Sequence, residues 1–283
     1  MKQFFSSRAV RRFTRNHLAL VGLFFVAAVG LTALLADVIA PYDPLAMDFD
    51  ALLSPPSATH PMGTDVLGRD LLSRVLYGSR YALLIGMGVV VLQMVLGGIL
   101  GLVAGFVGGV VDSLIMRAVD IVWSIPGLVL ALALAGALGG GIGVMIIAIA
   151  VTGWGQFTRL LRGQVLSLRE LDYVTAAYAL GASRTRILFR HVLPNALGPV
   201  VVYTTLEMPA AILSSAALSF LGVGAQPPIP EWGALIADGR GLIGFAWWVS
   251  TFPGLAIMIT ALGFNFVGDG LRDVLDPRFE RRI

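Results

Sequence analysis

Residues 18–40 read LALVGLFFVAAVGLTALLADVIA, and Asp37 is the only charged residue among them. A helix needs about 20 mostly apolar residues to cross the hydrocarbon core of a bilayer. The run is too long for the apolar region of a signal peptide, and no clear cleavage motif of small residues follows it. This stretch therefore predicts a transmembrane helix.

The composition of the whole chain supports the same class. Of the 283 residues, 57% are hydrophobic and only 13% are charged, whereas soluble globular chains carry about 25% charged residues. A soluble fold of this length could not bury so much apolar surface. The chain has no cysteine and only three scattered histidines, which excludes disulfides, thiol nucleophiles and metal clusters built from Cys or His.

Further apolar runs have the length of membrane spans and predict a polytopic, all-α protein with six transmembrane helices. The predicted spans are 18–40, 81–107, 118–138, 142–157, 196–223 and 248–268. Pro126 predicts a kink in the third span, and Gly139–Gly141 predict a tight turn before the fourth. Five prolines within 41–80 favour irregular structure there.

Basic residues are distributed unevenly between the two sides of these spans. With both termini on one side, sixteen of the 20 Lys and Arg residues lie there, in 1–17, 158–191 and 271–283 and at Arg117. The other side holds Arg69, Arg74, Arg80 and Arg240. Cytoplasmic loops carry the excess of basic residues. We therefore expect cytoplasmic termini (1–17 and 271–283), a cytoplasmic insert, and an external 41–80 segment ahead of a core at 81–270.

The insert between the fourth and fifth spans predicts two short helices. Residues 171–195 read LDYVTAAYALGASRTRILFRHVLPN. The first helix, 170–180, ends at Gly181, which suits a left-handed C-cap, and Ser183 can cap a second helix that Pro194 ends. Two interpretations are open: an amphipathic loop whose arginines meet anionic lipid, or a docking element for a cytoplasmic protein.

The insert resembles the EAA loop of ABC importer permeases. The resemblance rests on Ala176-Ala177, Gly181, Ile187 and Leu193-Pro194 within 158–195. In that family the loop forms a coupling helix that sits in a groove of the ATPase subunit. Thr175 stands where the family usually has Glu, which removes one charge from the contact. The resemblance assigns the ATPase-coupling interface to Thr175, Ala176, Ala177, Leu180, Gly181, Ala182, Ser183, Arg186 and Ile187.

Three other stretches are similar to one subfamily, the C-type permease of dipeptide and oligopeptide importers. They are HPMGTDVLGRDLLSRVLYGSR at 60–80, ALSFLGVGAQPP at 217–228 followed by Glu231-Trp-Gly, and LGFNFVGDGLRDVLDPR at 262–278. Together with the EAA-like loop they cover roughly residues 18–280 in the family's order. The resemblance implies a type I ABC importer permease fold.

The resemblance also implies a function and a set of partners. The chain would be the membrane-spanning subunit of an ATP-driven importer in the inner membrane of a prokaryote, and would form half of the pathway for di- and oligopeptides. Its partners would be a second homologous permease, two P-loop ATPases and an external binding protein, with no nucleic acid. Close relatives carry nickel chelates or glutathione. ATP and Mg would bind to the ATPase subunits, since the Gly-rich runs here lack the Gly-Lys-Ser/Thr end of a P-loop, so we expect no enzymatic activity or cofactor in this chain.

Glu207 is the one carboxylate deep within a predicted span, two residues before Pro209. Ionisable residues inside a membrane are costly and are usually functional. Glu207 either contacts a peptide's amino terminus or the partner subunit, or is hydrogen-bonded within the bundle. Members of the resembled family often have Glu where Ser215 stands here. Glu207 and Ser215 are therefore the substrate-path candidates.

Two groups of charged residues near the span ends have structural interpretations. Arg117 and Asp120 can pair across one helix face. The external group has the three- and four-residue spacing of a short surface helix, which would face solvent, the binding protein or the partner permease. Its members are Asp65, Arg69, Asp70 and Arg74.

Other functional classes fit the sequence less well. An ion-coupled secondary transporter usually has matching halves and buried carboxylates, but the chain shows no convincing internal repeat and a single deep Glu. An intramembrane protease needs catalytic residues within the spans, and the three histidines lie outside them. A scaffold that only binds a cytoplasmic partner stays open.

Overall fold

The computed structural model describes residue 11 and residues 13–275. Regular structure in this part of the chain is helical, apart from one isolated antiparallel bridge between Thr64 and Asp70. The elements are α2 (His17–Ile39), η1 (Phe49–Ala51), α3 (Leu71–Val107), α4 (Gly109–Trp123), α5 (Gly127–Ala137), α6 (Ile142–Arg169), α7 (Asp172–Ala179), α8 (Arg184–Ile187), η2 (Leu188–Val192), α9 (Leu193–Phe220), α10 (Trp232–Gly239) and α11 (Trp248–Leu275).

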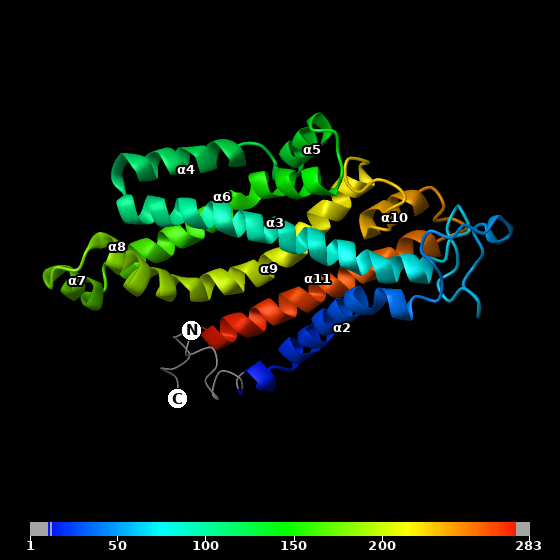
Figure 1. Ribbon diagram of the computed structural model, residues 1–283, viewed down its shortest axis with the longest axis horizontal. Coiled ribbons are helices and arrows are strands. Elements are labelled where there is room, and N and C mark those ends of the chain that lie inside the picture. Colours follow the sequence, from blue (N-terminus) through cyan, green and yellow to red (C-terminus); the bar gives the residue numbers. More distant parts are fainter. Residues whose placement is uncertain (1–10, 12, 276–283) are drawn as a thin grey trace.

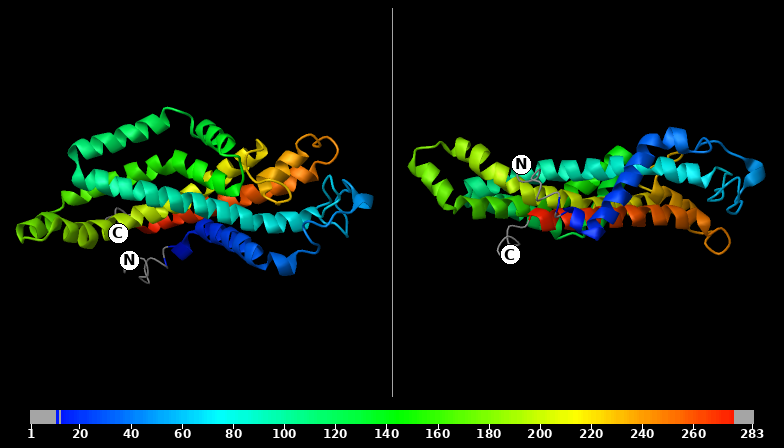
Figure 2. Two further views of the ribbon diagram at one scale, coloured as in Figure 1. Left: turned by 45° about the horizontal axis from the view of Figure 1, so that its top comes forward. Right: turned by 90° about the horizontal axis from the view of Figure 1, so that it is seen from below.

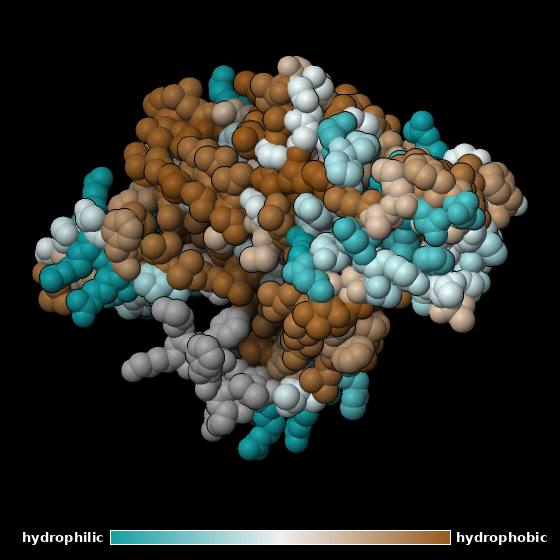
Figure 3. All heavy atoms as spheres, turned by 45° about the vertical axis from the view of Figure 1, so that its right-hand side comes forward, coloured by the Kyte–Doolittle hydropathy of each residue, from teal (hydrophilic) through white to brown (hydrophobic). Residues whose placement is uncertain are grey.

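The long helices α2, α3, α6, α9 and α11 run side by side as an elongated bundle (Figure 1). The short helices α7 and α8 project from one end, and residues 41–70 and α10 cover the other (Figure 2). α3 packs most extensively against α6, and α11 packs against both α2 and α9. In Figure 3 the helical middle is mostly hydrophobic, and hydrophilic residues gather towards the two ends. This is the pattern of a helix bundle that lies in a bilayer.

The all-α class and the multi-span prediction are confirmed. Within the described residues, five helices are long and apolar enough to cross a membrane, and α4 with α5 gives a sixth if that bent pair is one span. The kink predicted at Pro126 in the third span is confirmed, since α4 and α5 meet at 83° across the break at 124–126. The predicted start of this span at 118 is too late, because α4 begins at Gly109. Proline lacks the N–H that would continue the helix and disfavours α geometry in the residue before it.

Several helices extend beyond their apolar runs. α3 begins at Leu71 rather than 81, since the Asp70 carboxylate accepts a hydrogen bond from the Ser73 N–H at 2.8 Å and caps the helix. α6 continues past residue 157 to Arg169, and α11 continues past 268 to Leu275. Hydropathy reports the length of the apolar section, whereas a capped helix can continue into water. The predicted segments 41–80 and 158–195 therefore both contain helix.

Both ends of the described chain lie on the side of the bundle that carries α7 and α8. The Asn16 side chain, which caps α2, donates to the Asp273 carboxylate near the end of α11 at 3.3 Å. Six of the basic residues used to predict the orientation lie outside the described residues: Lys2, Arg8, Arg12, Arg278, Arg281 and Arg282.

A row of three glycines lets α3 approach α6 closely. Gly97, Gly101 and Gly105 recur every four residues along one face of α3. A Cβ at Gly97 would lie 2.2 Å from the Trp154 carbonyl oxygen, and one at Gly101 would lie 2.6 Å from that of Thr158. Small residues at this spacing let the backbones of two membrane helices pack together. These glycines lie in the most extensive helix–helix contact of the bundle, the one between α3 and α6.

The external charged cluster does not form a surface helix. All four residues are at most 4% exposed: Asp65, Arg69 and Asp70 lie in the loop that leads into α3, and Arg74 lies in the first turn of α3. The Asp65 carboxylate pairs with Arg69 at 2.7 Å and with Arg74 at 3.3 Å, and it also accepts the Arg69 backbone N–H. A tight loop gives the same three- and four-residue spacing as a helix, so spacing alone could not separate the two.

Two tryptophans fix the helices at this outer end. The Trp232 indole donates to the Val75 carbonyl of α3 at 3.0 Å, and the Trp248 indole donates to the Thr64 carbonyl at 3.1 Å. Glu231 caps α10 through the Ala234 N–H and is 2% exposed. Burial raises the pKa of the Glu231 carboxyl above its ordinary value, against the opposing effect of the hydrogen bonds that it accepts. The outer end is therefore a packed cap on the bundle.

Ion pairs join α4 to α6, and the pairing differs from the one expected. Asp120 pairs with Arg159 of α6 instead of Arg117, because α4 lies alongside α6. Asp112 accepts two hydrogen bonds from the Arg162 guanidinium, one of them at 2.6 Å. The Arg159 guanidinium also lies over the Trp123 ring at 4.0 Å. These contacts hold a helix that otherwise packs little against the bundle.

We expect the Asp112–Arg162 pair to stabilise the chain by about 1 kcal/mol, as measured by thermal unfolding in detergent of Asp112→Ala, Arg162→Ala and the double variant. This stabilisation is at the upper end for a partly exposed ion pair, because the Arg162 guanidinium donates two hydrogen bonds to the Asp112 carboxylate. The more exposed Asp120–Arg159 pair, at 62% and 45% side-chain exposure, provides the control and should give a smaller coupling. Equal couplings would contradict the argument from burial.

Candidate functional site

The α7–α8 pair is anchored by a small apolar core of its own. Val174 of α7, Ile187 of α8 and Val192 of η2 are fully buried together with Val165 of α6. This core lies apart from the large core of the bundle. Burying four branched side chains fixes the pair onto the ends of α6 and α9, so the projection is a folded unit and not a loose loop.

The turn between the two helices has the predicted geometry. Gly181 has φ of +79°, a left-handed conformation that glycine adopts without strain, and its N–H donates to the Tyr178 carbonyl. The Ser183 hydroxyl accepts the Arg186 N–H at 3.3 Å and caps α8. The first helix runs over Asp172–Ala179, slightly inside the predicted 170–180.

The second helix does not end at Pro194. α8, the π-helical turn η2 and α9 form one continuous helix from Arg184 to Phe220. Pro194 lies just after the π-helical turn η2, where the regular i→i−4 hydrogen bonding of the helix is already interrupted. The α8 end of the projection is therefore continuous with a helix that crosses the bundle.

Most of the predicted coupling residues line one shallow hollow on the projection. The hollow has a volume of about 590 Å³ and is bordered by Ala176, Ala177, Leu180, Gly181, Ala182 and Arg186, together with Tyr173, Arg190 and His191. Leu180 is 87% exposed at its rim. Thr175 is also exposed, whereas Ile187 is fully buried and contributes to the core rather than the surface.

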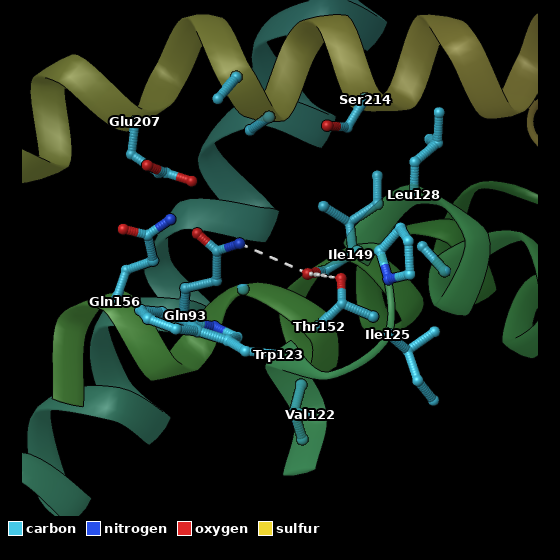
Figure 4. A pocket seen from close by; sticks show the side chains of 16 residues that line it. Gln93, Val122, Trp123, Ile125, Leu128, Ile149, Thr152, Gln156, Glu207 and Ser214 are labelled. Carbon is cyan, nitrogen blue, oxygen red and sulfur yellow. Dashed lines mark hydrogen bonds between the residues drawn. The ribbon is translucent and has the colours of Figure 1, made fainter. Parts of the chain in front are cut away.

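A second hollow, a cavity of about 440 Å³, lies near the middle of the bundle (Figure 4). α3, α6, α9 and the α4–α5 junction form its walls, and Glu207 of α9 points into it towards Gln93 and Gln156. Thr152 and Ser214 add hydroxyl groups. An apolar cavity with a few convergent polar groups is the usual form of a small-molecule site.

The two substrate-path candidates lie in different surroundings. Glu207 lines the cavity, whereas Ser215 is fully buried and donates its hydroxyl to the Ile212 carbonyl at 2.8 Å. The preceding residue, Ser214, faces the cavity instead. Consecutive side chains on a helix point about 100° apart, so a shift of one position decides whether a side chain lines the cavity or packs against a neighbouring helix.

Sequence reasoning missed the two glutamines of the cavity. Gln93 lies within the apolar run of α3, and Gln156 lies where the fourth apolar run ends. An uncharged amide inside a span carries the same kind of cost as a carboxylate, and this was the available signal. Their joint position with Glu207 depends on the register of three helices, which the sequence did not show.

The family described as binding-protein-dependent transport system inner membrane component matches residues 97–281. The chain belongs to this family. The α7–α8 pair and three walls of the cavity lie within the matched residues of the permease. Its residues 5–56 match the N-terminal TM domain of oligopeptide transport permease C.

Curated relatives match the permease over nearly its whole length. It is 48% identical to the dipeptide transport system permease protein of Escherichia coli strain K12, with 95% of this chain and 92% of the relative covered. It is 45% identical to the di/tripeptide transport system permease protein of Pseudomonas aeruginosa strain UCBPP-PA14, with 99% and 93% covered. The glutathione transport system permease protein of Escherichia coli O1:K1 is 44% identical, with 95% and 89% covered. The resemblance found in the sequence is confirmed: the permease is an integral inner-membrane component of the ABC importer class.

Proposed function

We propose that this permease forms half of the translocation pathway for di- and oligopeptides in an ATP-driven importer. The observation that carries the proposal is the α7–α8 pair, a rigid projection with its own buried core and a direct helical connection to the cavity wall. Coupling between two sites requires a discrete element whose position both sites can bias. The relatives named as di- and tripeptide permeases support the choice of substrate.

The proposed complex contains a second homologous permease, two P-loop ATPases and an external binding protein. The hollow on α7–α8 would seat on the ATPases, which bind ATP and Mg, and the outer cap around α10 would lie beneath the binding protein. Closure of the ATPases would move α7–α8 and open the pathway outwards, and hydrolysis would reset it. No step of that cycle requires a cofactor in this chain.

The proposed orientation places α7–α8 and both termini in the cytoplasm. It is supported by the excess of basic residues on that side, including Arg184, Arg186 and Arg190 on the projection. The loop 41–70 and α10 then face outwards. Glutathione is the second candidate solute, because a permease for it is 44% identical to this one and because glutathione is itself a small peptide.

The proposal is tested by purifying the tagged chain from its native membrane in mild detergent and identifying its partners by mass spectrometry. We expect a second six-helix permease and P-loop ATPases, and a co-purified binding protein that binds short peptides. Recovery of the chain alone, in several detergents and with nucleotide present, would instead favour a secondary transporter or an inactive scaffold.

A further inference from the structure

We infer that the central cavity is a subsite for the protonated amino group of a peptide in transit, with the Glu207 carboxylate as its charged partner. This inference rests on the proposed function and names the part of the substrate that the chain itself recognises. The hydrogen-bonding groups of the cavity that are already engaged within the chain limit the ligands that it can bind.

The donors on one wall of the cavity are already engaged by the backbone. The Gln93 amide N–H donates to the Ile149 carbonyl at 3.4 Å, and the Thr152 hydroxyl donates to the same carbonyl at 2.9 Å (Figure 4). Gln93 is only 2% exposed, and its Oε1 has no hydrogen-bond partner among the described residues. A buried acceptor left without a partner costs free energy that a bound donor would recover.

The opposite wall carries the carboxyl group of Glu207, which has no basic partner in the described part of the chain. Among the described residues, no Lys, Arg or His forms an ion pair with Glu207. Tyr203, one helical turn before Glu207, lies near the carboxyl group but is itself uncharged. Arg159, which stacks on the Trp123 ring at the cavity wall, is paired with Asp120. Placing a carboxyl group inside a membrane-spanning helix costs free energy, and a bound cationic ligand would offset that cost.

These groups select one kind of ligand. The Glu207 carboxyl group faces the cavity and the unpaired amide oxygen of Gln93 is buried in its wall, so the complementary group offers several N–H donors and a positive charge. The ammonium group of a peptide has three such donors. Gln156 and Ser214 can both donate and accept, which suits the first peptide group behind the ammonium. The volume of about 440 Å³ is within the range of small-ligand sites.

The subsite can be tested without relying on the binding protein, because the chain has no cysteine of its own. Ser214→Cys places one thiol at the cavity of the assembled importer in lipid nanodiscs. The probes are cationic 2-aminoethyl methanethiosulfonate and neutral methyl methanethiosulfonate, with labelling of this chain read by mass spectrometry. We expect Glu207→Gln to lower the cationic-to-neutral rate ratio about tenfold, the scale of one charge interaction at short range. A thiol at Ile243→Cys, which is 62% exposed in the loop after α10 and lies outside the cavity, provides the control and should show no dependence on Glu207.

Protection and transport complete the test. A dipeptide with a free amino terminus should slow labelling at Ser214→Cys, and its N-acetyl form should not. Glu207→Gln should reduce dipeptide uptake about tenfold, whereas Thr260→Val, which removes a buried hydroxyl of α11 away from the cavity, should leave uptake unchanged. A rate ratio that does not depend on Glu207, or equal protection by both peptides, would overturn the subsite. A wild-type importer that moves no peptide would instead overturn the proposed function, and the labelling ratio would still report on the charge.

Discussion

Gly181→Asp is expected to reduce peptide uptake to background while the chain still inserts and assembles with its partners. The glycine lies in the turn between α7 and α8 at φ of +79°, where a side chain strains the backbone even though no atom lies within 4 Å of the added Cβ. The new carboxylate would project into the hollow proposed to receive the ATPase. Basal ATP hydrolysis should persist and its stimulation by loaded binding protein should be lost. Both are measured in proteoliposomes.

Gly181→Ala is the matched control, since it introduces the same backbone strain without a charge or a long side chain. We expect it to keep most of the uptake. Wild-type uptake in Gly181→Asp vesicles would show that the α7–α8 pair is not the coupling element. Equal loss in both variants would assign the effect to the backbone of the turn rather than to the docking surface.

Gly97→Ala is expected to lower the free energy of unfolding by about 3 kcal/mol, at the upper end for an overfilled core. The added Cβ would lie 2.2 Å from the Trp154 carbonyl oxygen and 2.7 Å from the Phe157 Cβ. A backbone carbonyl cannot rotate away as a side chain can, so α3 and α6 would have to separate. Denaturation of the purified chain in mixed micelles measures the change.

Gly98→Ala is the control, one residue along the same helix. Its Cβ would meet only the Leu161 Cδ2 at 3.8 Å, an ordinary contact. Because alanine favours a helix over glycine by up to about 1 kcal/mol, this variant should be as stable as the wild type or slightly more stable. Similar losses at both positions would indicate that helix propensity, and not the contact with α6, controls stability here.

Much of the fold could be predicted because a bilayer leaves few choices. Apolar length identifies the spans, the glycine at position 181 marks the turn, and Ser183 marks the start of α8. These features depend on local chemistry, which is fully present in a single sequence. The helix ends at Leu71 and Arg169 were missed because high hydropathy marks only the apolar section of a helix, and the backbone stays helical beyond that section.

The remaining errors concern contacts between distant parts of the chain. The partners of Asp112 and Asp120 lie on α6, and the Asp65 cluster is buried by the loop that surrounds it. Such contacts depend on how helices are rotated against each other, which periodicity in one helix does not determine. For the same reason the sequence pointed to Glu207 but not to its neighbours Gln93 and Gln156.

The unbroken helix from Arg184 to Phe220 connects α8 directly to the wall of the cavity. Arg186 and Glu207 lie on it, about 30 Å apart along the axis. Pro199 lies between them and Pro209 just beyond, and each proline removes one backbone hydrogen bond and marks where a rod bends most easily. A bend at Pro199 would let the α8 end move without an equal movement of Glu207. The positions of these prolines along the helix would therefore influence how much of a movement at α8 reaches the cavity.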